Sequence, residues 1–245
     1  MTVPTGEQEP TVAAVLFDMD GTLVETEEYW GDALFGLARR YGGELSAIAR
    51  ASTVGQSLRT SLGVVYADLG LDRGRSADER RMRADARWVE DRVAELLAAG
   101  VHWRPGAREL LAAVRAAGLP TALVTTTARR LTDLVLAAIT RSFPGGLPFD
   151  VTVCGDEVPA RKPDPAPYLQ AAAALGVDVR RCVVVEDSAV GVTAGLASGA
   201  VVLGVPAMQA LEPAPGLVLR ETLAGVDPAD LAALLADRDA DGLRV

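Results

Sequence analysis

Five short apolar runs rich in β-branched residues alternate along this chain with segments of helical periodicity. The runs are Val12–Phe17, Thr121–Val124, Val151–Cys154, Val183–Val185 and Val201–Val205. The helical segments are Gly106–Ala117, Arg129–Ile139, Ala166–Leu175 and Ala189–Ser198. Apolar strands that alternate with helices are typical of a parallel sheet covered by helices on both faces. The chain is therefore expected to form an α/β fold with a Rossmann-like parallel-sheet core.

The interval from Thr26 to His102 departs from this alternation. Its apolar residues have helical spacing at Thr26–Tyr41, Leu58–Leu69 and Ala77–Ala99, and no strand-like run separates them. An interval of this length is too long for an ordinary loop. We therefore expect an inserted α-helical cap domain at residues 26–102, and a core catalytic domain formed by residues 11–25 and 103–245. Near the end of the core, we expect an edge strand from Leu217 and a last helix over Pro228–Leu235.

Composition narrows the class of protein. The chain has 245 residues, of which 49% are hydrophobic, so it can bury a large core. Its net charge of −9 argues against nucleic acid as a partner. No apolar run reaches the length of about 18 residues that a membrane span needs, and Met1–Pro10 is too polar for a signal peptide. Cys154 and Cys182 lie in apolar runs and are interpreted as buried thiols. We expect a soluble cytoplasmic monomer or homodimer without a membrane partner.

Two carboxylates follow the first apolar run directly, in Asp18-Met19-Asp20-Gly21. Neighbouring ionised carboxylates repel each other and are costly to bury at the end of a strand. A hard divalent cation with oxygen ligands offsets this cost, so the pattern predicts a magnesium site. Gly21 supplies the backbone freedom that the turn requires, and the N–H groups of such a turn can bind an anion.

Polar side chains also follow the other predicted strands. They are Thr125 and Thr126, the single lysine Lys162, and the pair Glu186-Asp187. Ligands of parallel α/β sheets gather at the carboxyl ends of the strands, so we expect these side chains at one edge. Four acidic residues would meet there. Mg²⁺ and Lys162 would have to offset their charge before a phosphate could bind.

These residues resemble the four motifs of the haloacid dehalogenase superfamily, in particular its phosphatases with a helical cap after the first strand. The motifs are Asp18 to Leu23, Thr125, Lys162 before Pro163, and Glu186-Asp187. The resemblance implies a Mg²⁺-dependent phosphatase for a small phosphorylated metabolite, such as a sugar phosphate or phosphoglycolate. Asp18 would be the nucleophile that forms an aspartyl-phosphate, and Asp20 would be the general acid and then the general base.

The resemblance also implies the remaining roles. Thr125 and Lys162 would bind the phosphoryl group, with Gly21 and Thr126 beside them. The metal ligands would be Asp18, the main-chain carbonyl of Asp20, Glu186 and Asp187. In the cap, the loop after Val54 resembles the substrate-facing loop of related caps. The candidates for contacts with the leaving group in this loop are Gln56, Ser57 and Arg59.

Two alternatives stay open. A β-phosphoglucomutase-like enzyme shares all four motifs, but it carries an arginine and a histidine where this chain has Leu58 and Trp30. The other alternative is a non-enzymatic protein that binds a metabolite. The complete set of motif residues argues against it. Individual residues also have simpler interpretations: Asp20 could cap a turn, and Lys162 could be a surface lysine.

Overall fold

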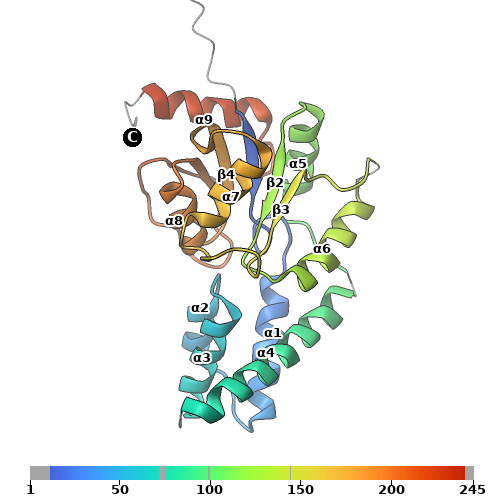
Figure 1. The fold of residues 1–245 in the computed structure, drawn as a ribbon, viewed down its shortest axis with the longest axis vertical. Coiled ribbons are helices and arrows are strands. Elements are labelled where there is room, and N and C mark those ends of the chain that lie inside the picture. Colours follow the sequence, from blue (N-terminus) through green and yellow to red (C-terminus); the bar gives the residue numbers. More distant parts are fainter. Residues whose placement is uncertain (1–11, 72–74, 99, 144, 241–245) are drawn as a thin grey trace, which may run out of the picture.

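The computed structural model describes residues 12–71, 75–98, 100–143 and 145–240 of the chain. Figure 1 shows a central sheet between layers of helices, with a further group of helices below it. The strands are β1 (Ala14–Phe17), β2 (Thr121–Val124), β3 (Val151–Val153), β4 (Cys182–Glu186), β5 (Val201–Gly204) and β6 (Leu217–Leu219). They pair in parallel in the order β3-β2-β1-β4-β5-β6. The predicted parallel α/β sheet is confirmed, including its edge strand.

Helices cover both faces of the sheet. Successive residues of β1 point to opposite faces, so each face has its own apolar cluster for the helices to cover. Val15 and Phe17 belong to one buried apolar cluster, and Ala14 and Leu16 belong to the other. The core helices are α5 (Ala107–Ala116), α6 (Arg129–Arg141), α7 (Ala166–Leu175), α8 (Ala189–Ala197) and α9 (Pro228–Ala240), with a 3₁₀ turn η1 (Val179–Arg181). Residues of α5, α6 and α9 join the first cluster, and residues of α7 and α8 join the second.

The register of the sheet brings the ends of its central strands level with one another. Phe17, the last residue of β1, lies opposite Leu123 of β2 and Val185 of β4. The residues that follow these strands therefore emerge at the same edge. This register explains why motifs far apart in the sequence meet in space.

Between β1 and α5 the described residues form four helices, and we call residues 26–102 the helical segment. They are α1 (Glu27–Arg40), α2 (Ala47–Thr53), α3 (Leu58–Asp68) and α4 (Arg75–Ala98). Helices α1, α3 and α4 match the three helical patterns of the sequence, although Ala99 lies outside the described residues. The segment lies at the end of the sheet where β1 stops (Figure 1). Its helices bury apolar side chains of their own, such as Leu34, Leu62 and Val89.

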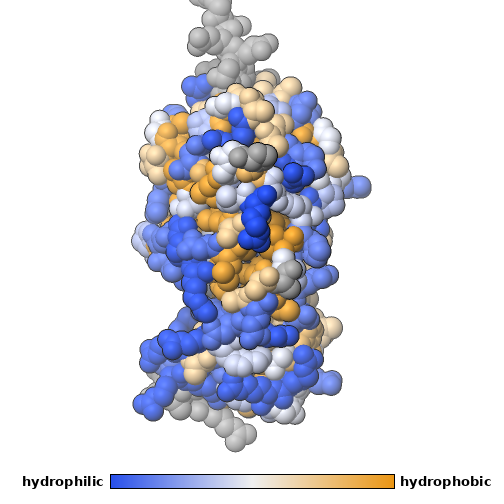
Figure 2. Space-filling model, turned by 90° about the vertical axis from the view of Figure 1, so that its right-hand side faces the viewer, coloured by the Kyte–Doolittle hydropathy of each residue, from blue (hydrophilic) through white to orange (hydrophobic). Residues whose placement is uncertain are grey.

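The surface differs between the two parts of the molecule. Figure 2 shows mostly hydrophilic side chains over the helical segment and an apolar area on the face around α6, where Leu134 is 40% exposed. No helix among the described residues has the length and apolar character needed to cross a membrane. Cys154 and Cys182 are free and buried, as the sequence predicts.

Candidate active site

Asp18 and Lys162 form a buried ion pair at the edge of the sheet. Asp18 directly follows β1, and its main-chain N–H donates to the carbonyl of Val185 on β4. Nζ of Lys162 lies 2.6 Å from Oδ1 of Asp18 and 2.6 Å from Oε1 of Glu186, and it donates to the carbonyl oxygen of Val124 at 2.9 Å. An ammonium has three protons, so all three have acceptors. Lys162 is therefore a buried residue of the site and not a surface lysine.

Three acidic side chains meet beside this lysine. Carboxylate oxygens of Asp18, Glu186 and Asp187 all lie within 4.8 Å of one another, and all three residues are buried. Burial and the charge of Glu186 raise the pKa of Asp18 from 3.8 to about 7, although Lys162 acts in the opposite direction. Burial, followed by the charges of Asp18 and Glu186, also raises the pKa of Asp187 well above its ordinary value. The cluster therefore has more negative charge than its surroundings stabilise.

Glu186 is already surrounded by hydrogen-bond donors. Its Oε1 accepts from Lys162 and, at 2.8 Å, from the hydroxyl of Tyr168. Its Oε2 accepts from the main-chain N–H groups of Asp187 and Ser188 and from the Ser188 hydroxyl, at 3.0–3.1 Å. Glu186 thus anchors Lys162 and the start of α8. Asp18 and Asp187 keep more free acceptor capacity for a cation.

The local backbone leaves room for Asp187 at this position. Gly21 has a φ of 80°, and a Cβ atom at this residue would overlap the carboxylate of Asp187. The hydroxyl of Thr22 donates to Oδ1 of Asp187 at 3.1 Å. Buried carboxylate oxygens with raised pKa values fit a hard divalent cation, which is the chemistry expected for Mg²⁺.

Three threonine hydroxyls hold the side chain of Asp20. Thr26 donates to its Oδ1, while Thr125 and Thr127 donate to its Oδ2 at 3.1 and 2.8 Å. This carboxylate does not belong to the acidic cluster, so only the main-chain carbonyl of Asp20 is left as a candidate metal ligand. The sequence indicates Thr127 as a supporting residue of the site, whereas no motif marks Thr26. The position of Thr127 in the run of threonines after β2 was the available signal.

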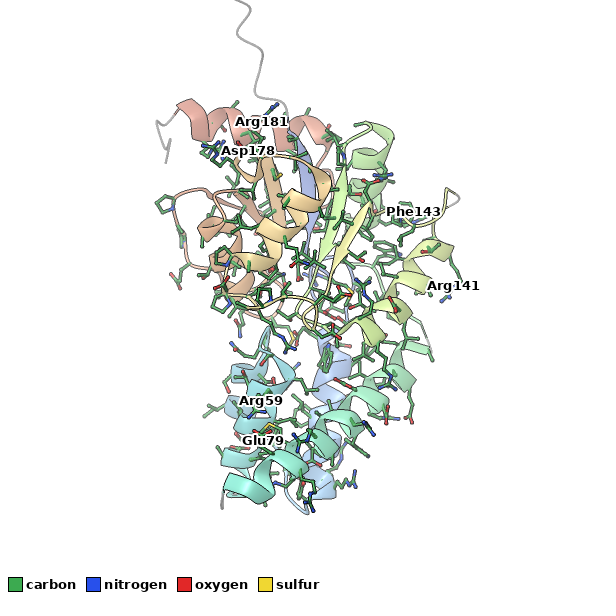
Figure 3. All side chains as sticks on the ribbon, viewed as in Figure 1. Arg59, Glu79, Arg141, Phe143, Asp178 and Arg181 are labelled. Atoms are coloured by element: carbon green, nitrogen blue, oxygen red, sulfur yellow. The ribbon has the colours of Figure 1, made fainter. Side chains whose placement is uncertain are left out.

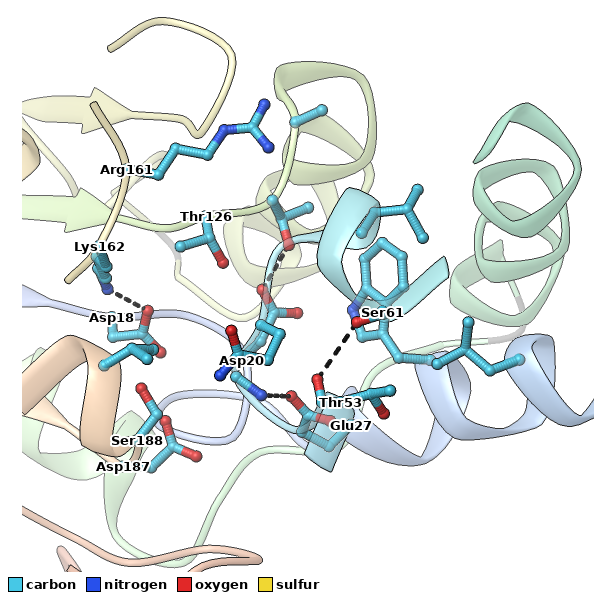
Figure 4. Close-up of a pocket in the computed structure, with 18 of the residues that line it drawn as sticks. Asp18, Asp20, Glu27, Thr53, Ser61, Thr126, Arg161, Lys162, Asp187 and Ser188 are labelled. Atoms are coloured by element: carbon cyan, nitrogen blue, oxygen red, sulfur yellow. Dashed lines mark hydrogen bonds and ion pairs between the residues drawn. The ribbon is translucent and has the colours of Figure 1, made fainter. Parts of the chain in front are cut away.

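A cavity of about 100 Å³ lies between the helical segment and the sheet edge. Figure 4 shows Asp18 and Lys162 on one side of it and Glu27, Thr53 and Ser61 on the other. The predicted residues on its wall are Asp18, Asp20, Gln56, Thr126, Lys162 and Asp187. The further side chains on the side of the helical segment include Glu27, Trp30, Leu34, Arg50, Leu58 and Glu90.

Two of the three predicted contacts with the leaving group do not lie on this wall. The guanidinium of Arg59 is solvated, with its side chain 65% exposed, and pairs with Glu79 on α4 (Figure 3). The hydroxyl of Ser57 accepts the main-chain N–H of Thr60 at 3.2 Å and caps the start of α3. The structure therefore places Ser57 and Arg59 away from the cavity wall, and their contact with the leaving group stays a prediction. Their neighbour Gln56 lines the cavity instead.

Comparisons with known proteins agree with this geometry. The family model of haloacid dehalogenase-like hydrolases matches residues 12–199. Protein CbbY of Rhodobacter capsulatus is 33% identical, over 79% of this chain and 85% of that protein. Hexitol phosphatase A of Escherichia coli K12 is 34% identical, over 78% of this chain and 82% of that protein.

A solved structure is similar as well. It is a mutant of CbbY from Rhodobacter sphaeroides in complex with xylulose-(1,5)bisphosphate, with a TM-score of 0.74 and 27% identity. The match covers 88% of this chain and 96% of that one. The resemblance stated from the motifs is thus confirmed over most of the chain. This protein belongs to the haloacid dehalogenase-like hydrolases and is an enzyme of their phosphatase type.

Proposed function

We propose that this protein is a Mg²⁺-dependent phosphatase that hydrolyses a small phosphorylated metabolite through an aspartyl-phosphate on Asp18. The observation that carries the proposal is the contact of 2.6 Å between Asp18 and Lys162 on the wall of an acid-rich cavity. This pairing gives one site both a carboxylate nucleophile and a cation for the phosphoryl oxygens. Relatives that are named as phosphatases support phosphate esters as substrates.

In the first step, a carboxylate oxygen of Asp18 attacks the phosphorus atom and the bond from phosphorus to the ester oxygen breaks. Asp20 gives its proton to that oxygen, so the alcohol leaves as a neutral molecule. Hydroxyl groups can both donate and accept hydrogen bonds. The three threonines around Asp20 can therefore hold its protonated and its ionised form.

In the second step, a water molecule attacks the phosphorus atom and loses a proton to Asp20. The bond between phosphorus and Asp18 breaks, which releases inorganic phosphate and restores the carboxylate. Lys162 stays beside Asp18 throughout and donates to the phosphoryl oxygens. Thr126, which follows β2 and lines the cavity, can act as a further donor, and Thr125 can do so when it releases Asp20.

A divalent metal, when bound, would neutralise negative charge on the phosphoryl oxygens and bring them to the nucleophile. The residues that would hold it are Asp18, Asp187 and the main-chain carbonyl of Asp20, with Glu186 behind them. The raised pKa values of Asp18 and Asp187 support this assignment, because a cation beside them would favour their ionised forms.

We infer that residues 26–102 act as a cap domain over the catalytic core of residues 11–25 and 103–245. Contacts join the two parts on several sides of the cavity. Arg130 on α6 pairs with Asp91 on α4 at 2.6 Å, and Gln209 donates to the carbonyl of Ala51 at 3.2 Å. A Cβ atom at Gly55 would lie 3.1 Å from the Cβ of Ser188. This arrangement supports exclusion of water from the reacting groups.

The mutase alternative has less support. Trp30 and Leu58, which replace the histidine and arginine expected of a β-phosphoglucomutase-like enzyme, both line the cavity. Incubation with glucose 1-phosphate and a bisphosphate primer separates the alternatives. We expect inorganic phosphate and no isomerised sugar phosphate.

The proposed function is tested by phosphate release from p-nitrophenyl phosphate with Mg²⁺ and after its removal by chelation. We expect Mg²⁺-dependent turnover in the wild type and a loss of at least about 10³-fold in Asp18→Asn, which removes the nucleophile but keeps its size. Equal turnover in Asp18→Asn would exclude Asp18 as the nucleophile. Thermal melts of both proteins check that the variant is folded.

A further inference from the structure

We propose that the leaving group of the substrate is an uncharged, hydroxylated carbon skeleton, and that Glu27 and Arg50 are the residue pair that sets this specificity. The inference rests on the proposed phosphatase function and narrows its substrate class. It excludes leaving groups that carry a second phosphate or a carboxylate. The argument begins with the charges on the wall of the cavity.

Glu27 and Arg50 form a buried pair on the cap side of the cavity. Their residues are 7% and 8% exposed, and Nη2 of Arg50 lies 3.2 Å from Oε2 of Glu27. The same nitrogen donates to the carbonyl oxygen of Glu27 at 2.7 Å, and Nη1 donates to the hydroxyl of Thr53 at 3.0 Å. A Cβ atom at Gly31 of α1 would lie 2.8 Å from Nε of Arg50, so α1 leaves space for the guanidinium.

This pairing removes Arg50 as a binding site for a substrate anion. The charged side chains on the cavity wall are the acids Asp18, Asp20, Glu27, Glu90 and Asp187 and the bases Arg50, Arg161 and Lys162. Lys162 is committed to the reacting end, beside Asp18. On the cap side, Arg50 is committed to Glu27, and Glu90 adds a further acid. An anionic leaving group would thus meet carboxylates on the cap side. Among the described lining residues on that side, no cation is left unpaired to bind it.

The same wall fits hydroxyl groups. Among the described residues, the Glu27 carboxylate accepts two long hydrogen bonds, from Arg50 at 3.2 Å and from the main-chain N–H of Gly55 at 3.3 Å. Its remaining lone pairs can accept from substrate hydroxyls. The amide of Gln56 can donate or accept, and Trp30 offers an aromatic surface for C–H groups.

Arg161 provides the rival interpretation. It is exposed on the core side of the cavity, and its Nε donates to the carbonyl of Gly155 at 2.5 Å. Its other nitrogens could meet a second anion of the substrate. The experiment must therefore separate a neutral leaving group from an anionic group held by Arg161.

Sorbitol 6-phosphate and 6-phosphogluconate make a matched pair of probes, because they differ only in a terminal hydroxymethyl group or carboxylate. For the wild type we expect kcat/KM to be at least about tenfold higher for sorbitol 6-phosphate. Glu27→Gln leaves Arg50 without its partner, so the ratio of kcat/KM for 6-phosphogluconate to that for sorbitol 6-phosphate should rise about tenfold. Arg50→Gln leaves Glu27 unpaired, so the ratio should fall.

The ratio is insensitive to the folded fraction of a variant, and opposite changes in two variants cannot come from a shared loss of stability. Glu28→Gln, at the exposed neighbouring position on α1, is the matched control and should leave the ratio unchanged. An unchanged ratio in both Glu27→Gln and Arg50→Gln would overturn the proposal. So would a wild type that prefers 6-phosphogluconate and loses this preference in Arg161→Gln.

Failure of this inference is distinguishable from failure of the proposed function. An enzyme that hydrolyses p-nitrophenyl phosphate but prefers the carboxylate probe would refute the specificity and keep the phosphatase. A protein that releases phosphate from none of the three esters would refute both.

Discussion

Nζ of Lys162 lies 2.6 Å from Oδ1 of Asp18, and the two side chains are only 2% and 10% exposed. Burial by itself would lower the pKa of the lysine, but the charges of Asp18 and Glu186 more than offset it, so the pKa is raised. Lys162 therefore stays protonated at neutral pH. A phosphoryl oxygen can reach it by replacing one of its three acceptors.

Lys162→Arg tests whether this contact requires a compact ammonium. We expect kcat/KM to fall by about 10²-fold, because the larger planar guanidinium cannot fit among three acceptors placed around one nitrogen. Steady-state kinetics with p-nitrophenyl phosphate measures the effect. Arg180→Lys exchanges the same residue types at an exposed position and should leave kinetics unchanged. Wild-type turnover of Lys162→Arg would show that the lysine is incidental.

Gly21→Ala tests the close approach of Asp187. A methyl group there would overlap the Asp187 carboxylate at a φ of 80°, so we expect weaker Mg²⁺ binding and a loss of about 1–3 kcal/mol in the free energy of unfolding. Calorimetric titration with Mg²⁺ and denaturant unfolding measure the two effects. Gly118→Ala has a similar φ of 73° with no atom near the new methyl group, so it controls for backbone strain alone. Equal Mg²⁺ affinity in both variants would contradict the proposed site.

The raised pKa of Asp18 predicts that Mg²⁺ binding depends on pH. Protons compete with the metal for this carboxylate, so affinity should fall about tenfold per pH unit below about 7. In the metal-free protein, the contribution of Asp18 to the free energy of unfolding has the opposite dependence on pH. Folding favours neutral Asp18, so this contribution to stability is present below pH 3.8 and is lost as the pH rises through about 7.

Thermal melts with and without Mg²⁺ from pH 5 to pH 8 measure both effects. The increase in Tm caused by Mg²⁺ should grow across this range. Asp178→Asn removes an exposed carboxylate whose pKa is lowered to about 2 by Arg180, and it should leave the profile unchanged. A Mg²⁺ effect that is constant with pH would show that Asp18 does not bind the metal.

Thr127→Val tests the support of Asp20. Loss of one of the three hydroxyl groups should lower kcat/KM about tenfold for an alkyl phosphate, whose leaving oxygen needs a proton. The effect should be smaller for p-nitrophenyl phosphate, because nitrophenolate leaves without one. Thr193→Val, at an exposed position of α8, is the control. Equal losses for both substrates would show that Thr127 does not support proton transfer by Asp20.

Much of the site could be predicted because its residues directly follow the strands. Asp18, Thr125 and Asp187 stand at or next to strand ends, and apolar β-branched runs identify buried strands in a sequence. Parallel strands bring their carboxyl ends to one edge. The positions of the strands in the sequence were therefore enough to predict that these residues lie close together.

The side of the cavity that the helical segment forms could not be predicted in the same way. Ser57 and Arg59 are near Gln56 in sequence, yet Gln56 lines the cavity while Arg59 pairs with Glu79 in solvent. A helix presents different side chains to the core and to solvent within one turn. Helical periodicity does not say which side of the helical segment will face the edge of the sheet where the acidic residues lie.

The sequence by itself determined the parallel α/β core, the helical character of the segment after β1 and the family to which the motifs belong. Each depends on local patterns of burial and on side-chain chemistry next to a strand end. Only the tertiary structure decided the strand order, the cradle of three threonines around Asp20 and the pairing of Glu27 with Arg50. These features depend on how segments that are distant in the sequence pack against one another. Local sequence patterns do not specify that packing.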